Sequence, residues 1–115
     1  EVIVAGGSQR RFSFLHQAGA TTFLTGVGNL FPKIDIDFYN EFLSKNIERA
    51  NKLTRLFENP LFDVFMNIGW HKSLRSALKI MDLSCYYNRS PFPDCTSKEI
   101  NLIKKTLDKI GKASE

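Results

Sequence analysis

The stretch Val2–Gln9 (VIVAGGSQ), near the start of the 115-residue chain, decides the fold. Four apolar residues, mostly β-branched, are followed at once by two glycines, which is typical of a short buried strand that ends in a tight turn. Ser8 then offers a side-chain oxygen that can cap a helix, and we expect that helix to reach about Ala18 and to end at Gly19. This segment therefore predicts a strand, a glycine turn and a helix.

The same pattern returns in Ala20–Asn29 (ATTFLTGVGN), where a second apolar and threonine-rich strand is followed by glycines. Pro32 suits the first turn of a helix, and apolar residues at helical spacing continue as far as Leu43. The order is strand, helix, strand, helix, and a helix-long connection between two strands requires them to run parallel.

The remainder of the chain, from residue 46 onward, is predicted to be helical in three segments. We expect Pro60 to separate the first two segments, because proline breaks a helix interior. Gly69 is expected to weaken the second segment in its middle, because glycine is a poor helix former.

The proline-containing run 85–95 (CYYNRSPFPDC) is predicted to be a loop before the last helix. Thr96 and Glu99 have the spacing of a capping box, in which each side chain bonds the backbone N–H of the other residue. We expect this helix to end at Gly111.

The two strands pose a problem of burial. Both are almost entirely apolar, as parallel strands covered on both faces are, but a sheet of two such strands leaves its edges and one face open. A (β/α)8 TIM barrel supplies the missing cover. The sequence therefore predicts an α/β fold: residues 1–45 form the last two βα units of a barrel, strands 7 and 8 with their helices, and residues 46–115 form a C-terminal three-helix extension. We expect a fragment of a larger enzyme, inactive and poorly stable by itself.

Composition excludes several classes of function. The formal net charge is +4, and the 16 basic and 12 acidic residues are scattered along the chain, so nucleic-acid binding is not predicted. No apolar run approaches the ~20 residues that a membrane span needs, so no membrane partner is expected. Cys85 and Cys95 form no disulfide framework, which favours a reducing, cytoplasmic location.

Five motifs in sequence order carry a resemblance to a known family. They are GGSQ (6–9), AGATTFLTGVGNLFPK (18–33), FYNEFLSKNIERANKL (38–53), WHKSLRSALKIMDL (70–83) and SPFP (90–93) before the capping box. In this order they resemble the C-terminal part of the dihydrodipicolinate synthase / N-acetylneuraminate lyase family of Schiff-base lyases, which are (β/α)8 barrels. The GVGNLFP variant resembles the sugar-acid dehydratase and aldolase branch more than the synthase branch.

The resemblance implies a lyase or aldolase that holds pyruvate or another 2-oxo acid as a Schiff base. In the family the imine forms on a lysine of the sixth strand, a tyrosine of the fourth strand relays protons, and the chains form tetramers. Neither residue is expected in a chain that begins at strand seven, so no catalytic residue is assigned here, and the missing N-terminal part of the barrel is the implied partner. No cofactor is predicted, and no metal either, because His16 and His71 stand alone.

Barrel active sites lie at the carboxyl ends of the strands. The predicted substrate-binding residues are Gly6, Gly7, Ser8, Gln9, Phe23, Leu24, Thr25 and Gly26. The resemblance places Phe23 or Leu24 against pyruvate. It also implies acidic residues at positions 8 and 9 in the lyase branch, and their absence disfavours a sialic acid lyase.

Three other interpretations remain open at this stage. Glycine loops after the last two barrel strands also bind phosphate in many barrels. A dinucleotide site is disfavoured, because the glycines lack the spaced triplet of that fold. A non-enzymatic helical binding module with a short βαβ start is the alternative outside the enzymes.

Overall fold

The computed structural model of the chain describes residues 2–84 and 87–114, with side chains as far as residue 112. The chain divides into two compact units, residues 1–58 and residues 59–115, here called the first and second units. The predicted division at residue 45, between barrel and extension, stays a prediction.

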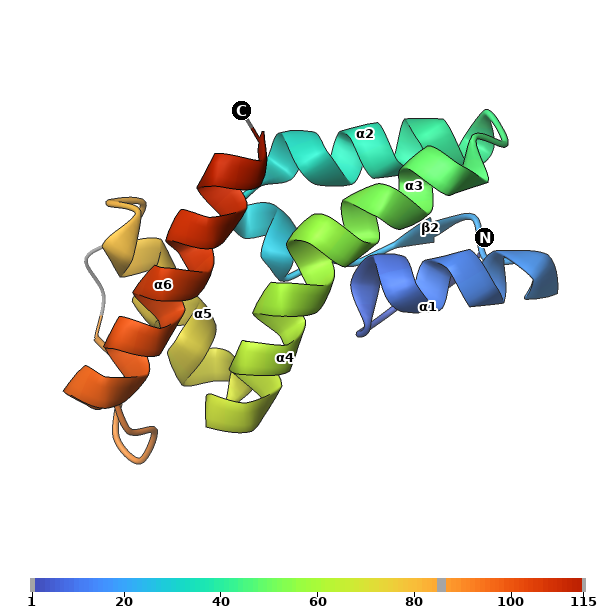
Figure 1. The fold of residues 1–115 in the computed structure, drawn as a ribbon. Coiled ribbons are helices and arrows are strands. Elements are labelled where there is room, and N and C mark those ends of the chain that lie inside the picture. Colours follow the sequence, from blue (N-terminus) through green and yellow to red (C-terminus); the bar gives the residue numbers. More distant parts are fainter. Residues whose placement is uncertain (1, 85–86, 115) are drawn as a thin grey trace. The chain divides into compact units, whose positions relative to one another are not determined.

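The first unit contains the predicted strands and their helices (Figure 1). Strand β1 (Ile3–Val4) pairs in parallel with β2 (Thr22–Phe23), with Ile3 opposite Thr22 and Val4 opposite Phe23. The parallel arrangement is as predicted, although both strands are shorter than their apolar runs. The other elements are α1 (Ser8–Leu15), the 3-10 turns η1 (His16–Ala18) and η2 (Val27–Asn29), α2 (Pro32–Leu43), α3 (Ile47–Leu53) and the π-helical turn η3 (Thr54–Glu58).

An aromatic cluster around Phe12 forms the core of the first unit. The Phe12 ring is fully buried, and its centroid lies 5.1 Å from that of Phe23 and 5.3 Å from that of Phe42. Val4, from β1, belongs to the same cluster. Helices α1 and α2 therefore cover one face of the strand pair, whereas Ile3 and Leu24 remain 51% and 61% exposed.

Helix α1 begins differently from the prediction. Gly7 occupies the N-cap with a positive φ of 76°, and Ser8 is the first helical residue, is buried, and makes no capping hydrogen bond. Instead, the carboxylate of Glu58 accepts the backbone N–H of Gln9 at 2.9 Å. The predicted stop at Gly19 is confirmed, because Gly19 adopts a φ of 97° after η1.

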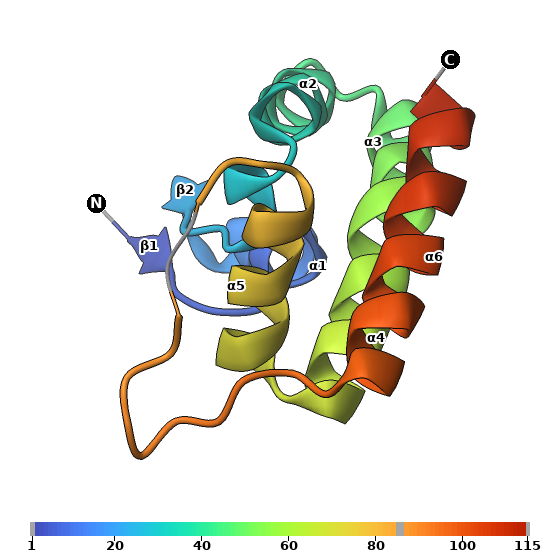
Figure 2. The same ribbon diagram turned by 90° about the vertical axis from the view of Figure 1, so that its left-hand side faces the viewer.

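The second unit is helical, as Figure 2 shows, with a division that differs from the predicted one. Helix α4 (Asn59–Ile68) begins directly after the π-helical turn η3, so Pro60 lies in its first turn and separates nothing. The break falls at Gly69, before α5 (Trp70–Ile80). Gly69 has a φ of 125°, which L side chains rarely adopt, and this conformation ends the helix completely rather than weakening it.

The last helix, α6 (Ser97–Ser114), starts as predicted and ends later. The Thr96 N–H donates to Glu99 Oε2 at 2.7 Å, and the Glu99 N–H donates to Thr96 Oγ1 at 3.3 Å, which confirms the capping box. Gly111 lies inside the helix, so the predicted stop there is wrong. The loop over residues 87–96 is confirmed, and Cys85 and Tyr86 lie outside the described residues.

Lys72 Nζ of α5 lies 2.7 Å from Glu99 Oε1 of α6, which joins these two helices at their amino-terminal ends. The buried apolar residues of the second unit are Leu61, Phe65, Ala77, Ile103, Leu107 and Ile110. Among the described helices, none has both the length and the apolar character needed to cross a lipid bilayer.

Candidate functional site

The predicted site residues follow the two strands at the same edge, because parallel strands end on the same side. Their exposure differs widely. Gly6 and Leu24 are exposed, Gly7, Phe23, Thr25 and Gly26 are half-buried, and Ser8 and Gln9 are buried. Only part of the predicted set is therefore open to a ligand in the described chain.

The backbone at Gly6 is open to close approach. Gly6 and Gly7 both have a φ of 76°, the left-handed region that glycine adopts without strain. A Cβ added at Gly6 would meet no atom within 4 Å, whereas one at Gly7 would lie 2.6 Å from Arg11 Cγ. A ligand can reach the Gly6 backbone, and the Arg11 stem covers the corresponding position at Gly7.

Phe23 and Leu24, which the sequence left as alternatives, point to opposite faces of the strand. The ring of Phe23 packs on the side of the helices, 5.8 Å from that of Phe38. Leu24 is 61% exposed on the other face, since successive strand side chains alternate. In a closed barrel the face away from the helices is the interior.

The loop after β2 is held by its own polar side chains. The Gly28 N–H donates to Thr25 Oγ1 at 2.9 Å, and Asn29 Nδ2 donates to the Gly26 carbonyl at 3.1 Å. A Cβ at Gly28 would lie 2.3 Å from Asp35 Oδ2, so a side chain at this position would displace the Asp35 carboxylate. Glycine at position 28 thus allows α2 to sit close against the loop.

A buried polar group, here called the Gln9 cluster, lies beneath these loops and consists of Gln9, Asp35, Thr54 and Glu58. Gln9 Nε2 donates to Asp35 Oδ1, and Thr54 Oγ1 donates to Gln9 Oε1 at 2.8 Å. Gln9 is only 1% exposed, so its amide is already bound from α2 and η3. A contact between Gln9 and a substrate stays a prediction, and the observed bonds give Gln9 a supporting role.

Sequence reasoning missed the three partners of Gln9. Asp35 precedes Phe38 by three positions, which places it on the buried face of α2, and Glu58 follows directly after the buried Phe57. Acidic residues at buried helical positions were the signal available in the sequence. The sequence could not show which residue these acids bind, because Gln9 is 49 positions from Glu58.

Burial raises the pKa of Glu58 from an ordinary value of 4.5 to about 7. Loss of hydration is the largest cause, and the Asp35 carboxylate adds to it, while the Gln9 N–H and Arg10 lower the pKa. Glu58 Oε1 and Asp35 Oδ2 are buried and have no hydrogen-bond partner in the described part of the chain. Near neutral pH the cluster therefore takes up or releases a proton.

Glu58 also bears on the phosphate interpretation. A phosphate at the start of α1 would use the free N–H groups of the first helical turn. The Gln9 N–H already donates to the Glu58 carboxyl group and is therefore not available to a phosphate. The amino end of α1 is therefore poorly suited to an anion.

The histidines are occupied in structural contacts. His16 Nδ1 lies 2.8 Å from the Ala20 carbonyl oxygen, and its ring contacts those of Phe12 and Phe42. In residues 2–84 and 87–114, no group of three or more His, Cys, Asp or Glu side chains is arranged to hold a metal ion.

Comparisons with known proteins place this geometry in a class of folds. No family model matches the chain. No curated protein matches it by sequence. Solved structures do match: a dihydrodipicolinate synthase from Thermotoga maritima is 23% identical with a TM-score of 0.84, over 96% of this chain and 37% of that one. A monomeric dihydrodipicolinate synthase variant is 23% identical with a TM-score of 0.83, over 96% and 36%.

The 4-hydroxy-tetrahydrodipicolinate synthase of Methylacidiphilum fumariolicum is 22% identical, with a TM-score of 0.77, over 97% of this chain and 45% of that one. The chain thus spans between about a third and a half of the length of these structures. The predicted resemblance is confirmed at the level of the fold: these residues fold like one segment of the dihydrodipicolinate synthase barrel.

Proposed function

We propose that this chain is the C-terminal part of a Schiff-base lyase or synthase of the dihydrodipicolinate synthase family, acting on pyruvate or another 2-oxo acid. One observation carries the proposal. The parallel strand pair is covered by helices on a single face, and Ile3 and Leu24 are exposed on the opposite face, beside the glycine loops. In a barrel that face lines the interior, and the loops surround the mouth.

In this proposal residues 1–45 supply strands 7 and 8, and the rest of the barrel supplies the imine-forming lysine and the proton-relaying tyrosine. Among the described residues no lysine lies on a strand, and those on exposed helix faces lack the desolvated pocket that makes a lysine nucleophilic. The 115-residue chain alone is then inactive. The intact parent is a cytoplasmic tetramer in this proposal.

The proposal gives different tasks to the predicted site residues. Leu24, rather than Phe23, faces the interior and packs against the bound 2-oxo acid. The open backbone at Gly6 and the half-buried Gly26 lie where a ligand would approach. Ser8 and Gln9 are buried beneath the loop and support it without touching the ligand. The bonds of Gln9 to Asp35 and Thr54 hold this loop, which follows β1, against α2 and η3.

The test uses a protein that contains these residues together with a complete barrel. Labelled pyruvate and borohydride are added, because borohydride reduces the imine to a stable adduct on the lysine. We expect wild type to be labelled on a lysine. Absence of labelling in wild type contradicts the Schiff-base proposal.

Gly6→Val tests the site, and Gly19→Val is its matched control. Both glycines have positive φ and open space for a Cβ, so backbone strain is similar in the two variants. Only Gly6 lies at the predicted mouth; Gly19 ends η1 at the far end of the helix. We expect Gly6→Val to weaken labelling by tenfold or more, roughly the effect of losing 1.4 kcal/mol of binding. Equal losses in both variants would show strain alone.

A further inference from the structure

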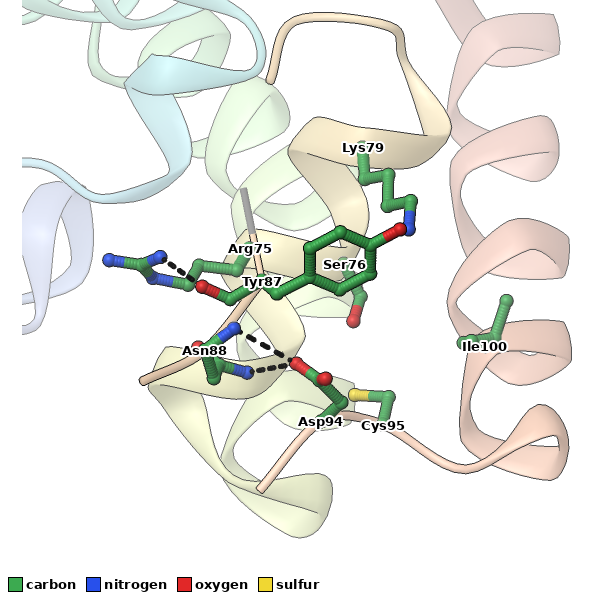
Figure 3. Close-up of a pocket in the computed structure, with 8 residues that line it drawn as sticks. All are labelled: Arg75, Ser76, Lys79, Tyr87, Asn88, Asp94, Cys95 and Ile100. Atoms are coloured by element: carbon green, nitrogen blue, oxygen red, sulfur yellow. Dashed lines mark hydrogen bonds between the residues drawn. The ribbon is translucent and has the colours of Figure 1, made fainter. Parts of the chain in front are cut away.

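The second unit contains a cleft between α5 and α6 that the proposed function does not use (Figure 3). A hollow of about 220 Å³ lies between α5, the loop over residues 87–95 and the start of α6. A neighbouring hollow of about 370 Å³ runs along the same two helices. Both are lined by Ser76, Lys79 and Ile100, so they form one continuous cleft.

Positive charge dominates this cleft. The described residues that line the larger hollow are Ser76, Lys79, Ile80, Ile100 and Lys104, and among them the charged groups are the two lysines, one from each helix. Neither amine forms an ion pair with a carboxylate in the described part of the chain. Both lysines are exposed and line the cleft from different helices, so an anion held there can be reached by both amines.

The acidic and basic groups of the smaller hollow are engaged with the loop. Asp94 Oδ1 accepts the N–H and the side-chain amide of Asn88 at 3.1 and 2.9 Å. Arg75 donates to the carbonyl oxygen of Tyr87 at 3.2 Å, and Lys79 Nζ lies 4.2 Å from the centre of the Tyr87 ring. Figure 3 shows Tyr87 above Ser76, with Ile100 across the opening. These contacts hold the rim in place while leaving the lysines without a carboxylate partner.

We propose that this cleft binds a small anion with two or three negative charges, with Lys79 and Lys104 as its counter-charges and the Ser76 hydroxyl as a further donor. Ile80 and Ile100 supply an apolar surface beside the charges, which suits a short carbon chain. A phosphorylated compound and a dicarboxylate share this chemistry, and the experiment separates them. The site lies entirely within residues 59–115, so it does not depend on the proposed lyase activity.

The test is equilibrium dialysis of the full chain with radiolabelled pyrophosphate and, separately, with radiolabelled glutarate, at constant ionic strength. Dialysis measures bound label whatever the oligomeric state of the protein. We expect saturable binding of one probe per chain, and a dissociation constant about tenfold higher in Lys104→Gln, because one charge-assisted contact is lost. Tighter binding of pyrophosphate identifies a phosphate site; tighter binding of glutarate identifies a carboxylate site.

Lys105→Gln is the matched control, since Lys105 is the next residue of α6, is exposed, and does not line the cleft. It removes the same charge and is expected to change the dissociation constant by less than about twofold. Lys79→Gln should weaken binding as Lys104→Gln does. The proposal is overturned if neither probe binds saturably, or if Lys104→Gln and Lys105→Gln weaken binding equally.

Discussion

Glu58 in the first unit and Glu99 in the second both place a carboxylate at the amino end of a helix, with opposite consequences. Glu58 is 1% exposed and accepts the Gln9 N–H of α1 from a distant part of the sequence. Glu99 lies in the first turn of its own helix, bonded to Thr96 and to Lys72. Burial raises the pKa of Glu58 to about 7, whereas the Lys72 amine lowers the pKa of Glu99.

The difference shows that the amino end of a helix stabilises the ionised form of a carboxyl group only when water or a cation also contacts that carboxyl group. The partial positive charge of a helix end is worth about 1 kcal/mol at most sites, and loss of hydration easily exceeds it. In the first unit the carboxyl group at the helix end is buried and comes from a distant part of the sequence, and in the second it belongs to the same helix and lies near solvent.

The largest effect is expected from Phe12→Ala in the first unit. Phe12 is completely buried and contacts the rings of Phe23, Tyr39 and Phe42. Deleting the ring should lower the free energy of unfolding by about 3–5 kcal/mol, from lost burial and the cavity left behind. Urea denaturation followed by circular dichroism measures the change.

Phe14→Ala is the control for Phe12→Ala, because Phe14 lies on the same helix and is 76% exposed. It should change the free energy of unfolding by less than about 0.5 kcal/mol. Amide hydrogen exchange then tests the comparison itself: in Phe12→Ala we expect protection to fall more in α1 and α2 than in α6. An equal fall in all three helices would mean that the two units unfold as one.

The second prediction concerns Glu58→Gln and pH. The folded-state pKa of about 7 lies above the ordinary 4.5, so the folded chain holds a proton that the unfolded chain releases between those values. Stability therefore falls as pH rises through this window, by at most about 3 kcal/mol, and stays low above it. Glu58→Gln removes this loss, so the variant should be more stable than wild type at pH 8 and similar to it near pH 4.5.

Glu48→Gln controls for a general loss of negative charge, because Glu48 is exposed in the first turn of α3. Its pH dependence should follow that of wild type. Asp35 and Arg10 face Glu58 and shift the midpoint, but they leave the sign unchanged as long as burial dominates. A Glu58→Gln variant less stable than wild type at pH 8 would show that the ionised carboxylate stabilises α1.

Local features were predictable from the sequence because their causes lie within a few residues. The stop at Gly19 and the capping box of Thr96 and Glu99 are examples. The predicted break at Pro60 was wrong for a reason that is also local. A proline is tolerated in the first turn of a helix, and α4 starts one residue before Pro60. Gly111 was mistaken for a stop because glycine permits a left-handed cap without requiring one.

The location of the candidate site was predictable from the sequence, but which side chains are open to a ligand was predictable only in part. Alternating apolar residues and glycines located the strand ends, because these depend on local patterns. Which side chains face a ligand depends on what covers each face, and that is set by distant residues. Gln9 shows the limit: its bonds to Asp35 and Thr54 span 26 and 45 positions, and no local pattern encodes them.

The smallest effect is expected from Thr96→Ala in the second unit. Thr96 Oγ1 accepts the Glu99 N–H, and its own N–H donates to the Glu99 carboxylate. Alanine keeps the backbone bond and loses the hydroxyl, which also donates to Glu99 Oε2 at 3.0 Å, so the free energy of unfolding should fall by about 1 kcal/mol. Thr106→Ala is the matched control on the same helix, because the Thr106 hydroxyl donates only to the Leu102 carbonyl of that helix and alanine is the better helix former.

The effect of Thr96→Ala should also depend on pH. Because the pKa of Glu99 is lowered, the stability that its carboxylate contributes is present at neutral pH and is lost as pH falls below the ordinary value of 4.5, the reverse of Glu58. Denaturation at pH 7 and pH 3 checks both points: the cost of Thr96→Ala should shrink at pH 3, and a cost that stays constant would show that the bond from the Thr96 hydroxyl to the Glu99 carboxylate does not stabilise the cap.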